Sequence, residues 1–359
     1  MKRRLLPGIL FLIFIFGGFE IFSQVYYLNE LETCSFIESE IFENVPKSTL
    51  DEMCSIQFSI KVPSEPTQEN IPNQHNEYVN INSFGFRGAE ISKEKPENVY
   101  RIIMLGGSTL FGYGATSDET TISGFLQKKF ETTDSDFKVE VINAGSSGAY
   151  SKTETLYVKH KLLDFDPDLI IVYDGWNDAR ISYTSHIGER GLAGQLYDNV
   201  KYLQSVLPYY KTPIVIREIG VNLGSDQNLR TWTDANLDKK VTLWKERWNE
   251  ICLLTQKNDI KTLITIQPIL GTGDRIVTES EKSTSGLLQG DFTQLSSSMQ
   301  KYVDVLPELT NCTKTADLTH VFDGHNEPLF VDLGHVEDHG SMIISEKIYE
   351  LVLPMINRK

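Results

Sequence analysis

The sequence predicts an α/β protein whose core is a parallel β-sheet covered by helices on both faces. From residue 99 onward, short runs rich in valine and isoleucine alternate with longer stretches whose apolar residues recur at helical spacing. Strands separated by helices are joined by right-handed crossovers, which makes the sheet parallel. The length of 359 residues suits one large domain with additions or two small domains, and the hydrophobic fraction of 40% is that of an ordinary globular protein.

The elements follow one another in regular alternation. The strand-like segments, such as VYRIIML and DLIIVYD, are the β-branched runs expected of strands buried on both faces. The predicted strands lie at 99–105, 137–143, 168–174, 261–267 and, for the short segment HVF, 320–322. The predicted helices lie at 120–131, 151–165, 236–258 and 341–356. In the longest of them, Trp244 and Trp248 are at helical spacing, and we expect both in the core.

Two segments precede this domain. Lys2, Arg3 and Arg4 stand before an apolar stretch at 5–19, which is typical of a secretory signal peptide or a short membrane anchor. The stretch is shorter than the roughly 20 residues of a full span, but no small-residue cleavage site follows it, which favours the anchor. Basic residues on the N-terminal side place the remaining chain outside the cytoplasm. We therefore predict a protein that is membrane-anchored with its catalytic domain outside the cytoplasm, or secreted if the segment is cleaved.

The segment between this stretch and the sheet domain is polar and rich in glutamate, asparagine and proline. VPSEPTQENIPNQHNEY is typical of an irregular linker, and VNINSFGFRG predicts a short strand pair joined at a glycine turn. The predicted organisation is therefore a signal or anchor at 1–23, a stalk or N-terminal extension at 24–97, and the main domain at 98–359.

Charge and cysteines restrict the partners and the compartment. A formal net charge of −15 opposes non-specific binding to nucleic acid or to anionic lipid, so we predict no nucleic-acid partner. In an exported chain, four cysteines can form two disulfides. Cys34 and Cys54 are the expected pair, because both lie in the N-terminal segment. Cys252 is either a buried thiol or bonded to Cys312.

The turn after the first strand, GGSTLFGYG, carries one serine, Ser108. A phosphate-binding P-loop is excluded because Tyr113 stands where its lysine is required. The G-x-S-x-G elbow is excluded because Leu110 stands where its second glycine belongs. What remains is a serine at the start of a helix, which is either a helix cap or a nucleophile next to N–H groups that favour negative charge.

Other segments supply the groups that an acyl-transfer serine needs. Asp332 precedes His335 by three residues, close enough for the carboxylate to orient the imidazole as a base. Gly148, after the second strand, offers a backbone N–H, and Asn177, after the third strand, offers a side-chain amide. Both are donors suited to a developing oxyanion.

These segments together resemble the SGNH (GDSL-type) hydrolase superfamily, over about residues 98–359. Its four blocks match LGGST, NAGSSG, Gly175-Trp176-Asn177-Asp178, and Asp332 with His335, in the family order. Two departures are Gly107 in place of the aspartate of G-D-S and Val336 in place of a common proline. The resemblance implies a three-layer α/β/α sandwich with a flavodoxin-like central sheet, and ester hydrolysis or acyl transfer without a cofactor.

The histidine-rich C-terminal stretch raises metal catalysis as an alternative. His335 and His339 are not in the H-E-x-x-H pattern, and Gly334 and Gly340 indicate a loop, so we predict no metal site. Trp176 and Tyr150 are interpreted either as a sugar-stacking surface or as packing residues. Asp178 is interpreted as structural, bonding the backbone of neighbouring turns.

The sequence thus predicts an extracytoplasmic serine esterase that removes small acyl groups from glycans or lipids through an acyl-enzyme. The predicted catalytic residues are Ser108, Gly148, Asn177, Asp332 and His335. The alternatives are an O-acyltransferase of the same fold that acts on surface glycans, and a non-catalytic glycan-binding protein. The loops at 180–195, 219–234 and 270–292 are expected to shape the substrate pocket. The acyl group, the alcohol and the oligomeric state are not predicted.

Overall fold

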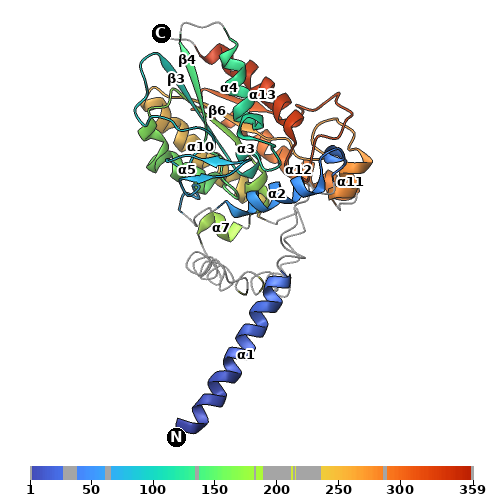
Figure 1. Ribbon diagram of the computed structural model, residues 1–359. Coiled ribbons are helices and arrows are strands. Elements are labelled where there is room, and N and C mark those ends of the chain that lie inside the picture. Colours follow the sequence, from blue (N-terminus) through green and yellow to red (C-terminus); the bar gives the residue numbers. More distant parts are fainter. Residues whose placement is uncertain are drawn as a thin grey trace. The chain divides into compact units, whose positions relative to one another are not determined.

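The computed structural model divides the chain into two compact units, which are described separately (Figure 1). The smaller unit comprises residues 1–34 and 187–231, and the larger comprises 35–186 and 232–359. The described residues are 2–26, 39–60, 66–133, 137–181, 183–188, 212, 215, 236–285 and 289–356.

The described part of the smaller unit is mainly a helix, α1 (Lys2–Tyr26). Near its end Glu20 accepts hydrogen bonds from the side-chain amide of Gln24 and from the N–H and hydroxyl of Thr212. A signal peptide or membrane anchor was predicted over residues 1–23. Among the described residues, no helix combines the length and the apolar character that crossing a membrane requires.

The larger unit is built on a five-stranded parallel sheet. Its strands are β3 (Val99–Gly106), β4 (Lys138–Asn143), β5 (Leu169–Asp174), β6 (Lys261–Ile266) and β7 (Lys314–Asp317). Their order in the sheet is β4-β3-β5-β6-β7, and all four pairings are parallel. This is the flavodoxin-like order, in which the direction of winding reverses between the first and third strands. Ligands bind such sheets beyond the carboxyl ends of the strands at this reversal, here β3 and β5.

Helices cover both faces of the sheet and complete three layers (Figure 1). Successive residues of a strand point to opposite faces, so Ile102 and Met104 of β3 belong to one core cluster and Ile103 and Leu105 to the other. The first cluster is closed by α4 (Ile122–Glu131) and α13 (Asp338–Val352). The second is closed by α5 (Ser151–His160), α10 (Leu237–Lys257) and α12 (Gln289–Asp304). The predicted α/β sandwich with a parallel sheet is confirmed.

The last predicted strand is wrong. Residues 320–322 form consecutive turns, in which the N–H of Val321 bonds to the carbonyl of Leu318. The fifth strand is instead β7, whose sequence KTAD has no apolar run. It lies at the edge of the sheet, where only one side pairs with a neighbour, so backbone pairing with β6 defines it rather than side-chain burial. Phe322 is nevertheless buried in the core, which explains why its segment resembled a strand.

The described part of the predicted stalk belongs to the larger unit. It contains α2 (Lys47–Ser59) and the paired strands β1 (Gln74–His75) and β2 (Asn80–Ile81). Arg87 follows β2 and has a side chain with no exposed surface. It forms an ion pair of 2.8 Å with Asp118 and donates to four backbone carbonyls of the larger unit. Because a buried guanidinium needs such partners, Arg87 ties the extension to the sheet domain.

Cys252 was predicted to be either a buried thiol or disulfide-bonded to Cys312, and it forms the disulfide. Cys252, on α10, is bonded to Cys312, which precedes β7. Cys54, on α2, is also disulfide-bonded. Its predicted partner, Cys34, lies outside the described residues.

Candidate active site

Ser108 stands where β3 ends, as the first residue of the short helix α3 (Ser108–Phe111). Two buried side chains hold the other end of this helix. Arg87 donates to the carbonyls of Phe111 and Gly112 over 3.0 and 2.9 Å. Asn143, the last residue of β4, donates to the carbonyl of Leu110 over 3.1 Å. The serine is therefore fixed by strand β3 on one side and by these donors on the other.

Three of the predicted residues form a continuous hydrogen-bonded line. The Oγ of Ser108 lies 2.8 Å from Nε2 of His335. The Nδ1 of the same imidazole lies 2.8 and 2.9 Å from the two carboxylate oxygens of Asp332. Because a carboxylate accepts, Nδ1 carries the proton and Nε2 is the atom that can accept the proton of the serine. This is the arrangement of a nucleophile, a general base and an orienting acid.

A compact loop presents the acid and the base. Asp332 accepts from the backbone N–H groups of Gly334 and His335 over 2.9 and 2.8 Å. The base of the loop is closed by an antiparallel bridge between Phe330 and Val336. The side chain of Glu281, which is 1% exposed, accepts from the N–H of Phe330 and forms an ion pair with the similarly buried Arg275. The catalytic loop is thus anchored to the segment after β6.

The electrostatics keep Asp332 charged. Burial alone raises the pKa of a carboxyl, but the charge and hydrogen bonds of His335, with the two backbone donors, outweigh it and hold the pKa of Asp332 well below its ordinary value. The ring of Tyr113 lies against the imidazole of His335, with 4.6 Å between the ring centroids. Burial and the negative charge of Asp332 raise the pKa of the Tyr113 phenol, so this neighbour is neutral.

The other two predicted residues, Gly148 and Asn177, both carry hydrogen-bond donors. Gly148 has φ +75°, a conformation that a residue with a side chain rarely adopts. Among the described residues, neither the Ser108 N–H nor the Gly148 N–H has a hydrogen-bond partner. The side-chain amide of Asn177, on α6 (Trp176–Arg180), donates one hydrogen to the carbonyl of Ala149 over 2.7 Å and has a second to offer.

The close approach of Asn177 to the serine turn explains why position 107 is a glycine. A Cβ at Gly107 would lie 2.4 Å from Nδ2 of Asn177 and 3.2 Å from the carbonyl of Ala149. The first distance is shorter than any non-bonded contact allows. An aspartate here would require the amide of Asn177 to move away, so the glycine and this position of Asn177 occur together.

The remaining neighbours are packing residues rather than exposed surface. Trp176 and Tyr150 are 2% and 4% exposed, so neither offers a face for stacking a sugar. Asp178 accepts from the N–H of Ser151 over 2.9 Å, as its structural interpretation predicted. Trp244 and Trp248 are fully buried, as predicted.

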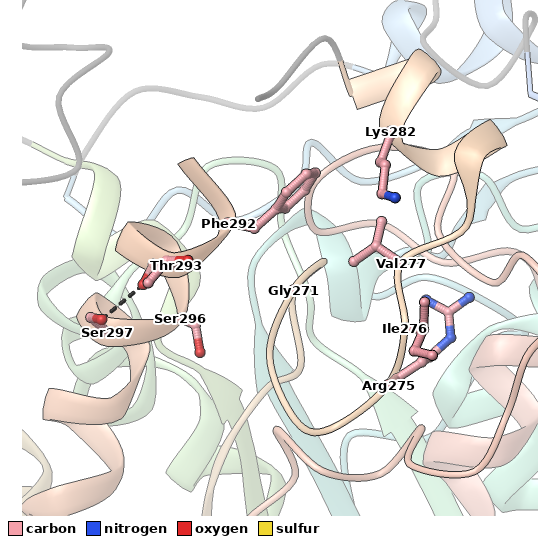
Figure 2. A pocket seen from close by; sticks show the side chains of 9 residues that line it. All are labelled: Gly271, Arg275, Ile276, Val277, Lys282, Phe292, Thr293, Ser296 and Ser297. Atoms are coloured by element: carbon pink, nitrogen blue, oxygen red, sulfur yellow. Dashed lines mark hydrogen bonds between the residues drawn. The ribbon is translucent and has the colours of Figure 1, made fainter. Parts of the chain in front are cut away.

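A pocket of about 410 Å³ lies at the predicted pocket-forming loop 270–292 (Figure 2). Most of the other two loops lies outside the described residues. One side is formed by Phe292, Thr293, Ser296 and Ser297 of α12, and the other by Gly271, Arg275, Ile276, Val277 and Lys282. Arg275, in the wall of the pocket, forms an ion pair with Glu281, which accepts from the N–H of Phe330 at the base of the loop that carries Asp332 and His335. The pocket therefore borders the same segment that anchors His335.

One cluster in the described part of the chain has the composition of a cation site. The ligand atoms of Asp274, His320 and Asp323 lie within 4.8 Å of one another. The carboxylate of Asp323 already accepts from Nδ1 of His320 and from the N–H of Asp274, each over 2.7 Å. None of the five predicted catalytic residues belongs to this cluster.

Sequence reasoning missed two groups of buried residues that support the site. Arg87 was overlooked because its role depends on carbonyls that lie far from it in the sequence. Glu154 and Asp174, buried behind Asn177, resemble ordinary helix and strand residues in the sequence. Only the packing of α5 and α10 against β5 places them together.

Comparisons with known proteins give likenesses in structure only. No protein-family model matches the chain, and no curated protein matches it. Among solved structures, an acetyl xylan esterase is similar at 17% identity and a TM-score of 0.40, over 70% of this chain and 99% of the other. A protein from Desulfitobacterium hafniense, described as lipolytic and of the G-D-S-L family, is similar at 12% identity and 0.40, over 70% and 98%.

A third similar structure is an acetylxylan esterase from Geobacillus stearothermophilus, at 13% identity and a TM-score of 0.41, over 70% of this chain and 93% of the other. All three likenesses are at low sequence identity. Function is inferred below from the geometry of the site itself.

Proposed function

We propose that this protein is a serine ester hydrolase that acts through an acyl-enzyme. The observation that carries the proposal is the line from Ser108 Oγ through His335 to Asp332, with both hydrogen-bond steps at 2.8 Å. A serine used only as a helix cap needs no imidazole at its hydroxyl, and the acid on the far side of that imidazole adds the third member of a triad.

The geometry supports a two-step reaction. Nε2 of His335 accepts the proton of Ser108 as Oγ attacks the ester carbonyl, and Asp332 stabilises the imidazolium. The N–H groups of Ser108 and Gly148 and the amide of Asn177 donate to the carbonyl oxygen as it gains charge. His335 then returns the proton to the leaving alcohol. Water, activated by the same imidazole, attacks the acyl carbonyl and releases the acid and the free serine.

We also propose that the substrates are small acyl esters of glycans or lipids and that the enzyme works outside the cytoplasm. The Cys252–Cys312 disulfide supports the location, because such bonds persist in oxidising compartments. The basic and apolar N-terminal sequence supports export. Fractionation of cells that express the full chain, with protease added to intact cells, tests this location. Protection of the protein from protease in intact cells would argue against it.

Covalent labelling tests the activity. We expect a fluorophosphonate to phosphorylate Ser108 in the full-length protein, and peptide mass spectrometry to locate the adduct there. Ser108→Ala is the matched control and should not be labelled. Labelling with no hydrolysis of p-nitrophenyl acetate, but with ester formation when alcohols are added, would indicate an acyltransferase. No labelling of the folded protein would contradict the proposal.

A further inference from the structure

The N-terminal extension contacts the turn that carries Gly148. Asn70, which is 2% exposed, donates from Nδ2 to the carbonyl of Gly145 over 3.0 Å. The Oγ of Ser146 donates to the backbone carbonyl of Gln68 and lies 3.3 Å from Oδ1 of Asn70. Hydrogen bonds therefore join the extension directly to the turn of the proposed oxyanion donor.

Gln68 is held in a backbone conformation that a glutamine rarely adopts. Its φ is +52°, in the left-handed region that favours glycine. Its carbonyl accepts from Ser146, whose N–H donates to the carbonyl of Gly106 at the end of β3 over 3.0 Å. The next residue, Glu69, forms an ion pair with Lys161, which follows α5. Neighbours on two sides thus fix a strained backbone, as is common at functional sites.

The side-chain amide of Gln68 presents its donor beside Gly148. Its Nε2 lies 3.7 Å from the position that a Cβ of Gly148 would occupy. Its Oε1 is fully buried and has no hydrogen-bond partner, whereas Nε2 is not fully buried and has no acceptor within the described part of the chain. The N–H groups of the amide therefore face accessible space, where an oxygen of a substrate can accept from them.

The cost of this arrangement indicates a use for the donor. An unpaired buried oxygen and a left-handed glutamine each raise the free energy of the folded protein. The same two features keep Nε2 of Gln68 next to Gly148, whose N–H is a proposed oxyanion donor. A side-chain donor and a backbone donor thus lie side by side beyond the carboxyl end of β4. Donors that are fixed in place before the reaction stabilise the charge that develops between them.

We propose that Gln68 is a further catalytic residue of the site: its Nε2 donates to the ester carbonyl oxygen, beside the Gly148 N–H, as that oxygen gains negative charge. The inference rests on the proposed function. It makes the N-terminal extension part of the active site, because the chain from residue 98 onward lacks this donor. Asn70 and Ser146 are positioning residues that hold Gln68 in place.

Two variants of similar size test the donor. Gln68→Met keeps the length of the side chain but removes the amide, and we expect kcat for p-nitrophenyl acetate to fall roughly tenfold with KM little changed. Gln68→Glu keeps the shape but sets a negative charge beside the oxyanion, so its kcat should fall further, by roughly 100-fold. Gln74→Met is the matched control, because the amide of Gln74 donates within the extension, to the carbonyl of Ile71 over 2.6 Å. Its kcat should be unchanged.

The order of the rates decides the outcome. Native kcat in Gln68→Met, or equal kcat in Gln68→Glu and Gln68→Met, would overturn the proposal and leave the hydrolase assignment intact. Melting temperatures of the variants show whether each is folded, and a residue that only packs would lower them without producing this order of rates.

Ser146→Ala gives a second test that leaves the Gln68 side chain in place. The variant removes the hydroxyl that holds the Gln68 carbonyl, so kcat should fall several-fold. In the Gln68→Met background the same substitution should lower kcat little further, because the donor that it displaces is absent. Independent, multiplicative losses would contradict a positioning role for Ser146.

Acetate binding separates failure of this inference from failure of the proposed function. The carboxylate oxygens of acetate suit the same donors that would bind an oxyanion. In the heteronuclear NMR spectrum of isotope-labelled, full-length Ser108→Ala, acetate should shift the side-chain amide resonance of Gln68, which the added Gln68→Met substitution identifies by its loss. No shift of this resonance would overturn the assignment even if the wild type is active. A shift in a protein whose wild type does not hydrolyse esters would leave the anion donor standing while the proposed reaction fails.

Discussion

At the residue scale, each side chain of the proposed site depends on a neighbour that takes no part in the proposed reaction. Arg87 and Asn143 hold the short helix of Ser108 by donating to its backbone carbonyls. Asp332, which bonds to His335, accepts from two backbone N–H groups that favour its ionised form. Asn177 occupies space that a Cβ at position 107 would need. Precise placement of donors and base, rather than unusual residue types, is therefore what the sequence has to encode.

Removing the side-chain donor of the oxyanion hole should slow the chemical step. For Asn177→Ala we expect kcat to fall roughly 10²- to 10³-fold, the range for loss of one such donor, while KM changes little. Steady-state hydrolysis of p-nitrophenyl acetate measures both constants. A loss of less than about threefold would remove Asn177 from the site.

A methyl group at position 107 should act through Asn177. The added Cβ of Gly107→Ala lies 2.4 Å from the Asn177 amide, so the amide must shift, and we expect kcat to fall about tenfold or more. The double variant with Asn177→Ala is the control. In the Asn177→Ala background, Gly107→Ala should lower kcat little further, because the amide that the added methyl group displaces is absent. Independent, multiplicative losses would show that Gly107 has another role.

At the element scale, the carboxyl ends of β3, β4 and β5 each carry one part of the site. The alternation of strands and helices allows more than one strand order. The residues that follow each strand, in contrast, can be read directly from the sequence. The predicted strands at 99–105, 137–143, 168–174 and 261–267 match β3 to β6 within one residue at each end. These strands have strong β-branched runs, whereas β7 has none, and it was missed for that reason.

The disulfide between α10 and the segment before β7 should stabilise the larger unit. It joins residues 60 positions apart. Closing a loop of this length reduces the entropy of the unfolded chain and raises its free energy by about 3–4 kcal/mol. Cys252→Ser/Cys312→Ser should lower the free energy of unfolding in urea by that order. The paired variant leaves Cys54 bonded, so it isolates this bridge where a reductant would not. A change below about 1 kcal/mol would contradict a stabilising role.

At the scale of the whole molecule, one buried histidine should make stability depend on pH. His186 has a side chain with no exposed surface, accepts from Arg247 at Nδ1 and donates from Nε2 to the carbonyl of Asp178. Burial, and then the charges of Arg247 and Lys240, lower the pKa of His186 to about 4, against the opposing effects of the Asp178 carbonyl and Asp174. The imidazole is therefore neutral in the folded protein.

The sign of the pH effect follows from proton uptake. Between about pH 6.5 and 4 the unfolded chain binds a proton at His186 that the folded chain excludes, so stability falls as the pH falls through this window. The full difference is on the order of 3 kcal/mol and is reached below about pH 4. His186→Gln preserves both hydrogen bonds without titrating, so urea unfolding of the two proteins should diverge on acidification. Parallel stability curves would show that His186 does not remain neutral.

The sequence predicts the parallel sheet and its covering helices, but not the buried contacts that hold distant segments together. The sheet class and the five proposed site residues were predicted from local patterns, because strand ends and short motifs are contiguous in the sequence. The inclusion of the extension in the sheet domain through Arg87, and the burial of Glu154 and Asp174, depend on contacts between distant segments. No local pattern in one sequence records such contacts.

The proposed reaction depends first of all on Ser108 acting as a nucleophile that His335 activates. The most direct measurement is the rate of p-nitrophenyl acetate hydrolysis by the full-length protein and by Ser108→Ala at equal concentration, with thermal unfolding to show that both are folded. We expect turnover by the wild type, and a fall to the uncatalysed rate when the hydroxyl is removed. Equal rates for the two folded proteins would contradict it.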